Sequence, residues 1–356
     1  MSAYPGSEHE RRIAERDLHA LVEQIFATCE MAPADASVLA ASLVAADVRG
    51  IHSHGVLRVP EYVDKLRKLG VNPRGRPSIV EDNLAALVVD GGNSMGAIGS
   101  HFAMSHALKR ARTTNVAIAA VRGSNHCGAM FHYAMMALPE NMIGLAMTNA
   151  LPTMAPWGGK DKIIGINPLA VAIPAKSEAP IVLDAAFSYS SHGKIRIFHQ
   201  KGYPIPSTWA FDEEGAPTTE TEKAIKGLLQ PIGEYKGVGL ALVFGVLASM
   251  LSGAAYGTEL GNMIDGPKPG LDGHLFVAIH IAAFENVERF RTRVDGVIRQ
   301  IRESRPTDPS TKLYAPGGLE AETETAYRRD GIPLNDVTWE GLDRLAAEFK
   351  LSYRSL

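Results

Sequence analysis

The chain has 356 residues, of which 46% are hydrophobic and 21% are charged, as is usual for a globular protein. Its 36 basic and 39 acidic residues give a formal net charge of −3, and no run of Lys and Arg forms a basic stripe, so we expect no nucleic-acid partner. The two cysteines are too few for a disulfide scaffold and favour a reducing compartment. Residues 1–12 carry no apolar segment typical of a signal peptide, and we expect a cytoplasmic protein.

The N-terminal part of the chain has the apolar spacing of helices. Residues 9–29 and 34–49 are predicted to form two amphipathic helices, and a shorter third helix is expected from Glu61 to Leu69. We therefore predict a helical N-terminal region over residues 1–80, with the motif Ser53-His54-Gly55 between its second and third helices.

The middle of the chain alternates strands and helices only in part. Between residues 148 and 188 the predicted strands follow one another without room for helices. A purely parallel doubly wound sheet needs a helix between its strands, so we do not expect one here. We predict an α/β fold with a mixed, non-Rossmann sheet covered by helices over residues 81–304. A Pro- and Gly-rich loop at 305–322 and two short helices should complete residues 305–356 and pack back on the N-terminal region. The predicted strands cover residues 84–90, 116–121, 143–148, 168–174, 180–185 and 275–281, and the predicted helices 98–112, 237–258 and 285–303.

The uncharged segment 237–258 is long enough to cross a bilayer. Small residues recur in it every four positions, which would mark helix dimerisation in a membrane and close backbone packing in a soluble protein. We favour a central helix of a soluble protein, buried on all sides, and expect no membrane partner. The small residues are Ala241, Gly245, Ser249, Gly253 and Gly257.

The segment 47–58 concentrates residues suited to chemistry on a small acid. His54 can exchange a proton near neutral pH, and the fork of Arg58 matches a carboxylate. The alternative is a histidine-rich surface loop after a helix. His52 and His54 could form a metal-binding pair, but no carboxylate or Cys stands nearby at a zinc-like spacing, so we predict no metal site.

A second motif, Ser124-Asn125-His126-Cys127-Gly128, ends a predicted strand. His126 is either a working side chain or a core histidine that the backbone satisfies, and Cys127 is poorly placed for a dyad with its neighbour. No G-x-G-x-x-G follows a strand, so any dinucleotide would bind without the Rossmann fingerprint.

Taken together and in order, the motifs resemble those of the type 2 malate/L-lactate dehydrogenases from about residue 10 to 350. That family includes sulfolactate, ureidoglycolate and diketogulonate enzymes and the piperideine-2-carboxylate reductases. The matching motifs include Arg49-Gly50, Ser53-His54-Gly55, Arg58, Ser124-Asn125-His126, Thr148-Asn149, Pro156-Trp157-Gly158-Gly159, Asn167-Pro168, Asp184, Gly193-Lys194-Ile195 and Lys236-Gly237.

The resemblance implies an NAD- or NADP-dependent oxidoreductase, usually a homodimer, that moves a hydride between nicotinamide and C2 of a small 2-hydroxy or 2-oxo carboxylic acid. By motif position, His54, Ser53 and His126 would be catalytic. Substrate would be bound by Arg49, Arg58, Asn125 and Thr148. Cofactor would be bound by Asn149, Asp184, Ala185, Ala186, Ser188, Lys194, Tyr235, Lys236, Gly318, Leu319 and Glu320.

Two other functions stay open at this point. One is reduction of a cyclic imine carboxylate, and the other is a catalytically inactive protein that keeps the fold and binds a ligand. Asp184 would favour NAD, whereas His192, Lys194 and Arg196 would favour NADP, and we lean to NAD. Ala150, Phe187, Tyr235 and Cys127 depart from the family's usual residues around the predicted pocket, so the particular acid stays open.

Overall fold

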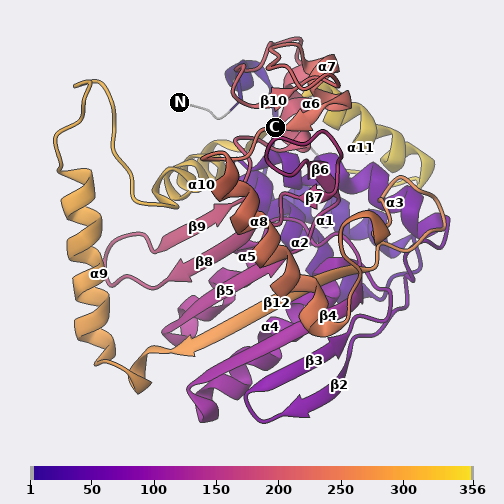
Figure 1. Cartoon of the computed structure of the whole chain (residues 1–356). Helices are drawn as coiled ribbons and strands as arrows, with labels where there is room; N and C mark the ends of the chain where they lie inside the picture. Colours follow the sequence, from indigo (N-terminus) through magenta and orange to yellow (C-terminus); the bar gives the residue numbers. More distant parts are fainter. Residues whose placement is uncertain (1–3, 354–356) are drawn as a thin grey trace.

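A seven-stranded sheet forms the centre of the computed structural model, which describes residues 4–353 (Figure 1). The strand order is β2-β3-β4-β12-β5-β8-β9. Strands β3 and β4 are parallel, and the other neighbouring strands are antiparallel. The mixed, non-Rossmann sheet predicted from the strand spacing is therefore confirmed. The strands are β2 (Ser78–Asn83), β3 (Ala86–Asp90), β4 (Val116–Ser124), β5 (Met142–Thr148), β8 (Leu169–Ile173), β9 (Ile181–Ala185) and β12 (Asp272–His280).

The two faces of this sheet are covered by different helices, because side chains alternate along each strand. Ala117, Ala119 and Val121 of β4 are buried in one core with α4 (Gly96–Thr114) and α5 (Phe131–Ala134). Ala120, the residue between them, packs on the other face beside α8 (Tyr235–Ser249). Figure 1 shows α8 crossing the front of the sheet and α4 behind it.

Helix α8 is shorter and less buried than the sequence predicted. It ends at Ser249, and Gly253 and Gly257 adopt positive φ values of 79° and 59°, which belong to turns. The small residues Ala241 and Gly245 are buried, whereas Val243 on the opposite side is 55% exposed. The prediction of burial on all sides is therefore wrong within this chain. Among the described residues, Tyr235–Ser252 is the one segment whose length and composition would suit a membrane span, and 33% of it is buried.

The N-terminal region packs with the end of the chain around one core. Strand β1 (Arg11–Ile13) pairs with β13 (Ile332–Leu334), so the predicted helix over 9–29 is wrong at its start. The helix begins at Glu15, because the preceding residues donate and accept bonds with β13 instead. How the chain divides into three regions stays a prediction. The helices here are α1 (Glu15–Ala27), α2 (Pro33–Val48), α3 (Val59–Arg67), α10 (Gly318–Asp330) and α11 (Asp336–Glu348).

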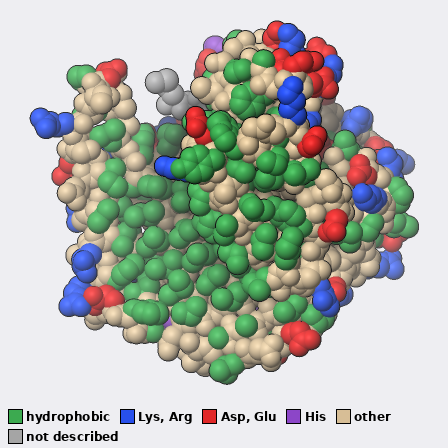
Figure 2. All heavy atoms as spheres, in the orientation of Figure 1, with side chains coloured by type: hydrophobic (Ala, Val, Ile, Leu, Met, Phe, Trp, Pro, Cys, Tyr) green, Lys and Arg blue, Asp and Glu red, His purple; other side chains and the backbone are tan. Residues whose placement is uncertain are grey.

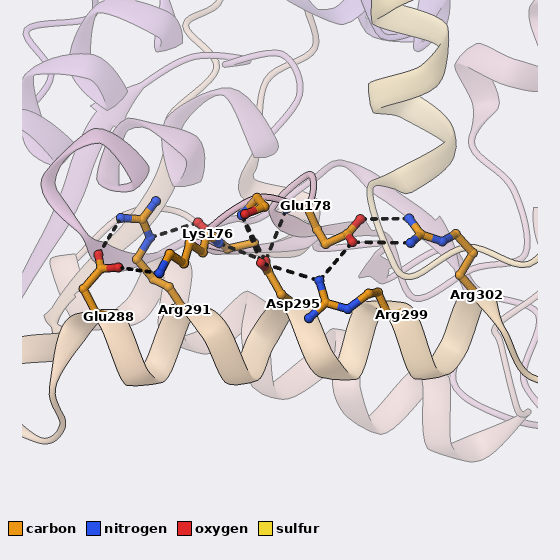
Figure 3. Close-up of polar contacts among 9 residues, drawn as sticks. Lys176, Glu178, Glu288, Arg291, Asp295, Arg299 and Arg302 are labelled. Atoms are coloured by element: carbon orange, nitrogen blue, oxygen red, sulfur yellow. Dashed lines mark hydrogen bonds and ion pairs between the residues drawn. The ribbon is translucent and has the colours of Figure 1, made fainter.

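Helix α9 (Val287–Arg302) stands beside the β8–β9 turn at one edge of the molecule (Figure 1). The buried carboxylate of Asp295 accepts backbone N–H bonds of 2.9–3.3 Å from Lys176, Ser177 and Glu178. Glu178 in turn pairs with Arg299 and Arg302 (Figure 3). These contacts fasten the helix to the turn. The predicted 305–322 loop is shorter than expected, because α10 starts at Gly318.

The remaining elements form a small layer above the sheet (Figure 1). Helix α6 (His192–Gln200) starts where the Ser191 hydroxyl accepts a bond from the N–H of Lys194. Its apolar side packs in a separate core with residues from α8. The other elements are α7 (Thr221–Lys226) and two short strand pairs, β6 (Pro152–Met154) with β7 (Ile164–Gly165) and β10 (Ala210–Phe211) with β11 (Leu228–Leu229).

Candidate active site

The turn that carries His54 is held by a buried carboxylate. Helix α2 ends at Val48, and Gly50 follows with φ 75°, which turns the chain into two short 3₁₀ segments, His52–His54 and Val56–Arg58. Asp47 lies 2.7 Å from His52 Nδ1 through one oxygen, and its other oxygen accepts the N–H of Val56 at 2.7 Å. His52 therefore stabilises the turn. Among the described residues, no group of three or more His, Cys, Asp and Glu is placed to hold a metal.

The two predicted catalytic imidazoles lie face to face. The rings of His54 and His126 are 5.9 Å apart and 15° from parallel. Ser53 Oγ is 3.0 Å from His54 Nδ1. Burial and the nearby charge of Arg58 lower the pKa of His54 to about 3, and the same causes hold the pKa of His126 well below its ordinary value. Both rings are therefore neutral at neutral pH.

Tyr62 determines which nitrogen of His126 carries the proton. Its hydroxyl lies 2.5 Å from His126 Nδ1, and the N–H of Gly128 also points to that nitrogen at 3.4 Å. Because a backbone N–H can only donate, Nδ1 is an acceptor. Burial raises the pKa of the Tyr62 hydroxyl, which stays protonated and also donates to Nδ1. With Nδ1 accepting, the neutral ring carries its proton on Nε2. His126 can therefore donate a hydrogen bond to a ligand.

A cationic wall stands beside these rings. Arg58 donates from Nε to the carbonyl of Ser53 at 3.0 Å and from a terminal nitrogen to Glu61 at 2.9 Å. Arg196 binds the other carboxylate oxygen of Glu61. After burial itself, the charges of Lys162, Arg196 and Arg58 help to lower the pKa of His192 to about 4. In the cavity wall the cations Arg58, Lys162 and Arg196 outnumber the carboxyls of Glu61 and Asp272, which favours an anionic ligand.

These side chains line a cavity of about 380 Å³, a size that suits a small substrate beside part of a coenzyme. The structure brings five of the predicted site residues into its wall: His54, Arg58, His126, Thr148 and Asn149. Other lining residues include Glu61, Tyr62, Cys127, Lys162, His192, Arg196 and Asp272.

Three predicted residues lie behind the wall. Ser53 supports His54 from behind, and Asn125 joins loops by bonds of 2.9 Å to Ser94 and Gly270. Arg49 is buried, pairs with Glu324 at 2.7 Å and lies 5.1 Å from the Phe131 ring. None of the three lines the cavity, so direct substrate binding by Arg49 and Asn125 has no support in this geometry.

The predicted cofactor residues outside the cavity fall into two groups. At the end of β9, Asp184 accepts the N–H of Phe131 at 2.8 Å, and burial raises its pKa to about 6. The charges of Glu320 and Arg49 also act on this carboxyl, so the first turn of α10, with Gly318 and Leu319, lies near it. Ala185, Ala186 and Ser188 follow Asp184 along the chain. Lys194 lies on α6, with its Nζ 4.8 Å from the Trp209 ring, and Tyr235 and Lys236 begin α8.

Several lining residues had not been predicted. Tyr62 lies one helical turn after Arg58, a spacing that could have indicated it. Asp272 belongs to β12, which begins three residues before the predicted strand, and burial raises its pKa to about 7. His274, next to the cavity, bridges Thr148 and Ser124 at 2.8 Å each. No local pattern marks these two, because their role depends on strand register.

The chain is similar to known dehydrogenases along almost its whole length. Residues 13–343 match the family model described as malate/L-lactate dehydrogenase. The chain is 34% identical to a malate dehydrogenase of Pyrococcus abyssi over 343 residues, 94% of each chain. It is 30% identical to an NAD(+) ureidoglycolate dehydrogenase of Escherichia coli O157:H7, over 93% of this chain and 95% of that one.

Solved structures give the same result. The sulfolactate dehydrogenase of Methanocaldococcus jannaschii superposes with a TM-score of 0.88 at 32% identity, over 96% of this chain and 98% of that one. A Δ1-piperideine-2-carboxylate reductase of Pseudomonas syringae superposes with a TM-score of 0.84 at 27% identity, over 94% and 100% of the two chains. The resemblance found in the motifs is confirmed, and the chain is an oxidoreductase that belongs to the malate/L-lactate dehydrogenase family.

Proposed function

We propose that the protein transfers a hydride between a nicotinamide coenzyme and C2 of a small 2-hydroxy or 2-oxo carboxylic acid. The observation that carries this proposal is the pair of neutral imidazoles, His54 and His126, stacked at 5.9 Å on the cavity wall beside Arg58. A carboxylate beside the guanidinium would place the neighbouring C2 oxygen within the reach of such rings.

The two imidazoles divide the work at that oxygen. His126, whose Nδ1 accepts from Tyr62, donates a hydrogen bond from Nε2. His54 exchanges the proton: it takes the hydroxyl proton when the acid is oxidised and returns it when the oxo acid is reduced. Burial and then the charge of Arg58 lower the pKa of His54. A substrate carboxylate paired with Arg58 would offset that charge and raise the pKa of His54 toward a working value.

The proposed coenzyme supplies the hydride acceptor or donor. Its ribose hydroxyls suit the carboxylate of Asp184, and its phosphates suit the start of α10, where no side chain caps the first backbone amides. Arg49 Nε is also buried there without a hydrogen-bond partner among the described residues. Asn149 and Lys236 complete the set proposed from the family motifs. We favour NAD because a carboxylate, Asp184, is the central polar group of this set.

A panel of substrates tests the proposal. Purified protein is mixed with 2-oxo acids, including diacids, and with cyclic imine carboxylates, and NADH or NADPH absorbance is followed. Turnover of an oxo acid supports the proposal, and a lower KM for NADPH than for NADH would overturn the preference for NAD.

Reduction of a cyclic imine carboxylate is the second candidate, because it needs the same carboxylate clamp and hydride but protonates nitrogen. The reductase with a similar structure favours including it. Turnover of imines alone would select it. No turnover of any panel member, with coenzyme binding retained, would favour the third possibility, an inactive ligand-binding homologue.

We also propose that the protein is a homodimer, with the partner copy covering the open side of the sheet. Figure 2 shows hydrophobic side chains gathered over α8 and the strands beside it. Ile118 and Leu183 of the sheet and Leu240, Val243 and Leu247 of α8 are 36–55% exposed, and α8 has no charged side chain after Lys236. Contiguous apolar surface of this kind is typical of subunit interfaces.

Sedimentation tests the homodimer. Val243→Glu should shift the wild-type dimer to monomers, because a buried charge opposes association. Glu259→Gln, a change outside this surface, is the control. An active wild-type monomer would overturn the proposal. Both cysteines are buried and free, in keeping with the reducing, cytoplasmic location that we propose.

A further inference from the structure

The loop before β12 forms part of the cavity wall and has no role in the proposed reaction so far. The N–H of Gly261 donates to the carbonyl of Gly270 at 2.8 Å, which closes residues 261–270 into one loop, the 261–270 loop. The N–H of Gly270 also donates to Asn125 Oδ1 at 2.9 Å, which fixes the end of the loop to the motif of His126. The lining residues from this loop are Gly261, Asn262, Met263 and Ile264.

One buried side chain holds the middle of this loop. Lys65 of α3 has no exposed surface. Its Nζ donates to the carbonyl of Asn262 and to that of Lys268, at 2.5 Å each. The 261–270 loop therefore lies beside α3 (Figure 1). Burying an ammonium group is costly unless it is hydrogen-bonded, so the two carbonyls and Lys65 stabilise one another.

Lys65 belongs to the side of α3 that faces the cavity. Arg58 at the start of the helix, Glu61 and Tyr62 line the cavity. Lys65 follows Glu61 by four residues and Tyr62 by three, a spacing that places side chains on one side of a helix. Lys65 itself does not line the cavity, so any effect on a ligand passes through the loop.

Gly70, just after α3, allows the loop to approach this closely. A Cβ at Gly70 would lie 2.3 Å from the carbonyl oxygen of Gly266 and 2.6 Å from Lys65 Cε. Only glycine fits between helix and loop at this point. The backbone and Lys65 together thus define where the loop lies.

We propose that Lys65 is a positioning residue of the substrate site: it holds the 261–270 loop in place as a wall of the cavity before the acid binds. The loop supplies no group to the proposed acid–base step. Its position therefore affects how tightly the acid is bound and not the rate of that step. This inference rests on the proposed function, in which the cavity holds the acid.

The test compares Lys65→Met with wild type. Methionine keeps a long apolar stem in the buried site and removes both N–H donors. The loop is then in place in only a fraction of the molecules, and KM rises as this fraction falls. We expect KM for the acid to rise about tenfold, the loss of one bond to a charged group, with kcat and the affinity for NADH near wild type. An unchanged KM, or a loss confined to kcat, would overturn the proposal.

Two further variants separate the loop from the helix. Lys68→Met removes an ammonium group from the same end of α3 that pairs with Asp64 at 2.8 Å, so KM should stay at the wild-type value. Asp265 lies in the loop, is exposed, and accepts the N–H of Asn262 at 2.8 Å. Asp265→Ala loosens the loop without touching α3 and should also raise KM. It keeps the test possible if Lys65→Met does not fold, and an unchanged KM would again overturn the proposal.

Oxamate, an unreactive analogue of a 2-oxo acid, gives a readout that needs no turnover. With NADH present, its Kd should rise about tenfold in Lys65→Met and stay unchanged in Lys68→Met. Hydrogen exchange in the 261–270 loop should accelerate in the first variant and not in the second.

The oxamate measurement also separates this inference from the proposed function. If wild type binds oxamate but turns over no panel member, the proposed function fails, and the oxamate Kd values still decide the role of Lys65. An equal Kd in wild type and Lys65→Met would refute that role. A wild type that neither turns over a panel member nor binds oxamate would overturn both proposals.

Discussion

Mild acid should destabilise this protein, because five largely buried imidazoles are uncharged in the folded chain. Burial lowers the pKa of His54 to about 3 and that of His132, His192 and His274 to about 4, and it holds the pKa of His126 well below its usual value. In an unfolded chain the pKa of histidine is about 6.5. Below that pH the unfolded chain binds protons that the folded chain does not, so stability falls as pH falls.

The size of this effect follows from the distance between the two pKa values. At about pH 5, protonation of each imidazole stabilises the unfolded chain by about 2 kcal/mol, which is about 10 kcal/mol for the five. Two carboxyls act in the opposite direction, because burial raises the pKa of Asp184 to about 6 and of Asp272 to about 7. The folded chain binds their protons first, which adds back about 4 kcal/mol at about pH 5. The effect of the histidines is the larger one, so the free energy of unfolding falls by about 6 kcal/mol. The net stability of a typical protein is about 5–15 kcal/mol.

Urea unfolding between pH 8 and pH 5 measures this loss. His132→Phe removes one buried imidazole outside the cavity and keeps a ring beside Tyr133. Its loss of stability over this range should be about 2 kcal/mol smaller than that of wild type. Met135→Leu, a conservative change in the same core, should leave the pH dependence unchanged. Stability that stays constant or rises toward pH 5 would refute the reasoning.

Three other variants test the site and its scaffold. His54→Ala should lower kcat by about 10²–10⁴ while coenzyme affinity, measured by NADH fluorescence titration, stays near wild type; full turnover would remove His54 from the mechanism. Arg58→Gln should raise KM for the acid about tenfold or more, because a charge-assisted bond to the carboxylate is lost, and an unchanged KM would contradict that role. Asp295→Ala should weaken the contact between α9 and the β8–β9 turn by about 3 kcal/mol, because three backbone N–H groups lose their acceptor. Hydrogen exchange in α9 should then accelerate, and unchanged protection would show that other contacts hold the helix.

The sheet could be predicted where strands are apolar, and not where pairing alone defines them. The buried residues of β4 and β5 form runs that mark strands in the sequence. Strand β2 is an exposed, polar edge strand, and β1 forms only through its pairing with β13, more than 300 residues away. Local sequence carries no signal for such long-range partners.

The site shows the same division. His54 and His126 could be identified because each lies in a short motif at the end of an element. Their supports, such as Tyr62 and His274, come from other elements and depend on how the chain packs. Arg49 shows the same limit from the other side: its motif is present, but its guanidinium pairs with Glu324 of α10 and does not line the cavity, which no local pattern could show.

Acid sensitivity and catalysis have one physical cause in this protein. A base that must accept a hydroxyl proton has to be neutral when substrate arrives, and burial beside Arg58 secures this for His54. Because of the same burial, folded His54 stays unprotonated in mild acid, whereas the unfolded histidine binds a proton. The folded state therefore loses stability at mildly acidic pH. An anionic substrate should relieve both effects, because its carboxylate offsets Arg58 and lets His54 bind a proton inside the fold. A saturating 2-oxo acid should therefore stabilise the protein more at pH 5 than at pH 8. Equal stabilisation at both pH values would show that a carboxylate bound to Arg58 does not raise the pKa of His54.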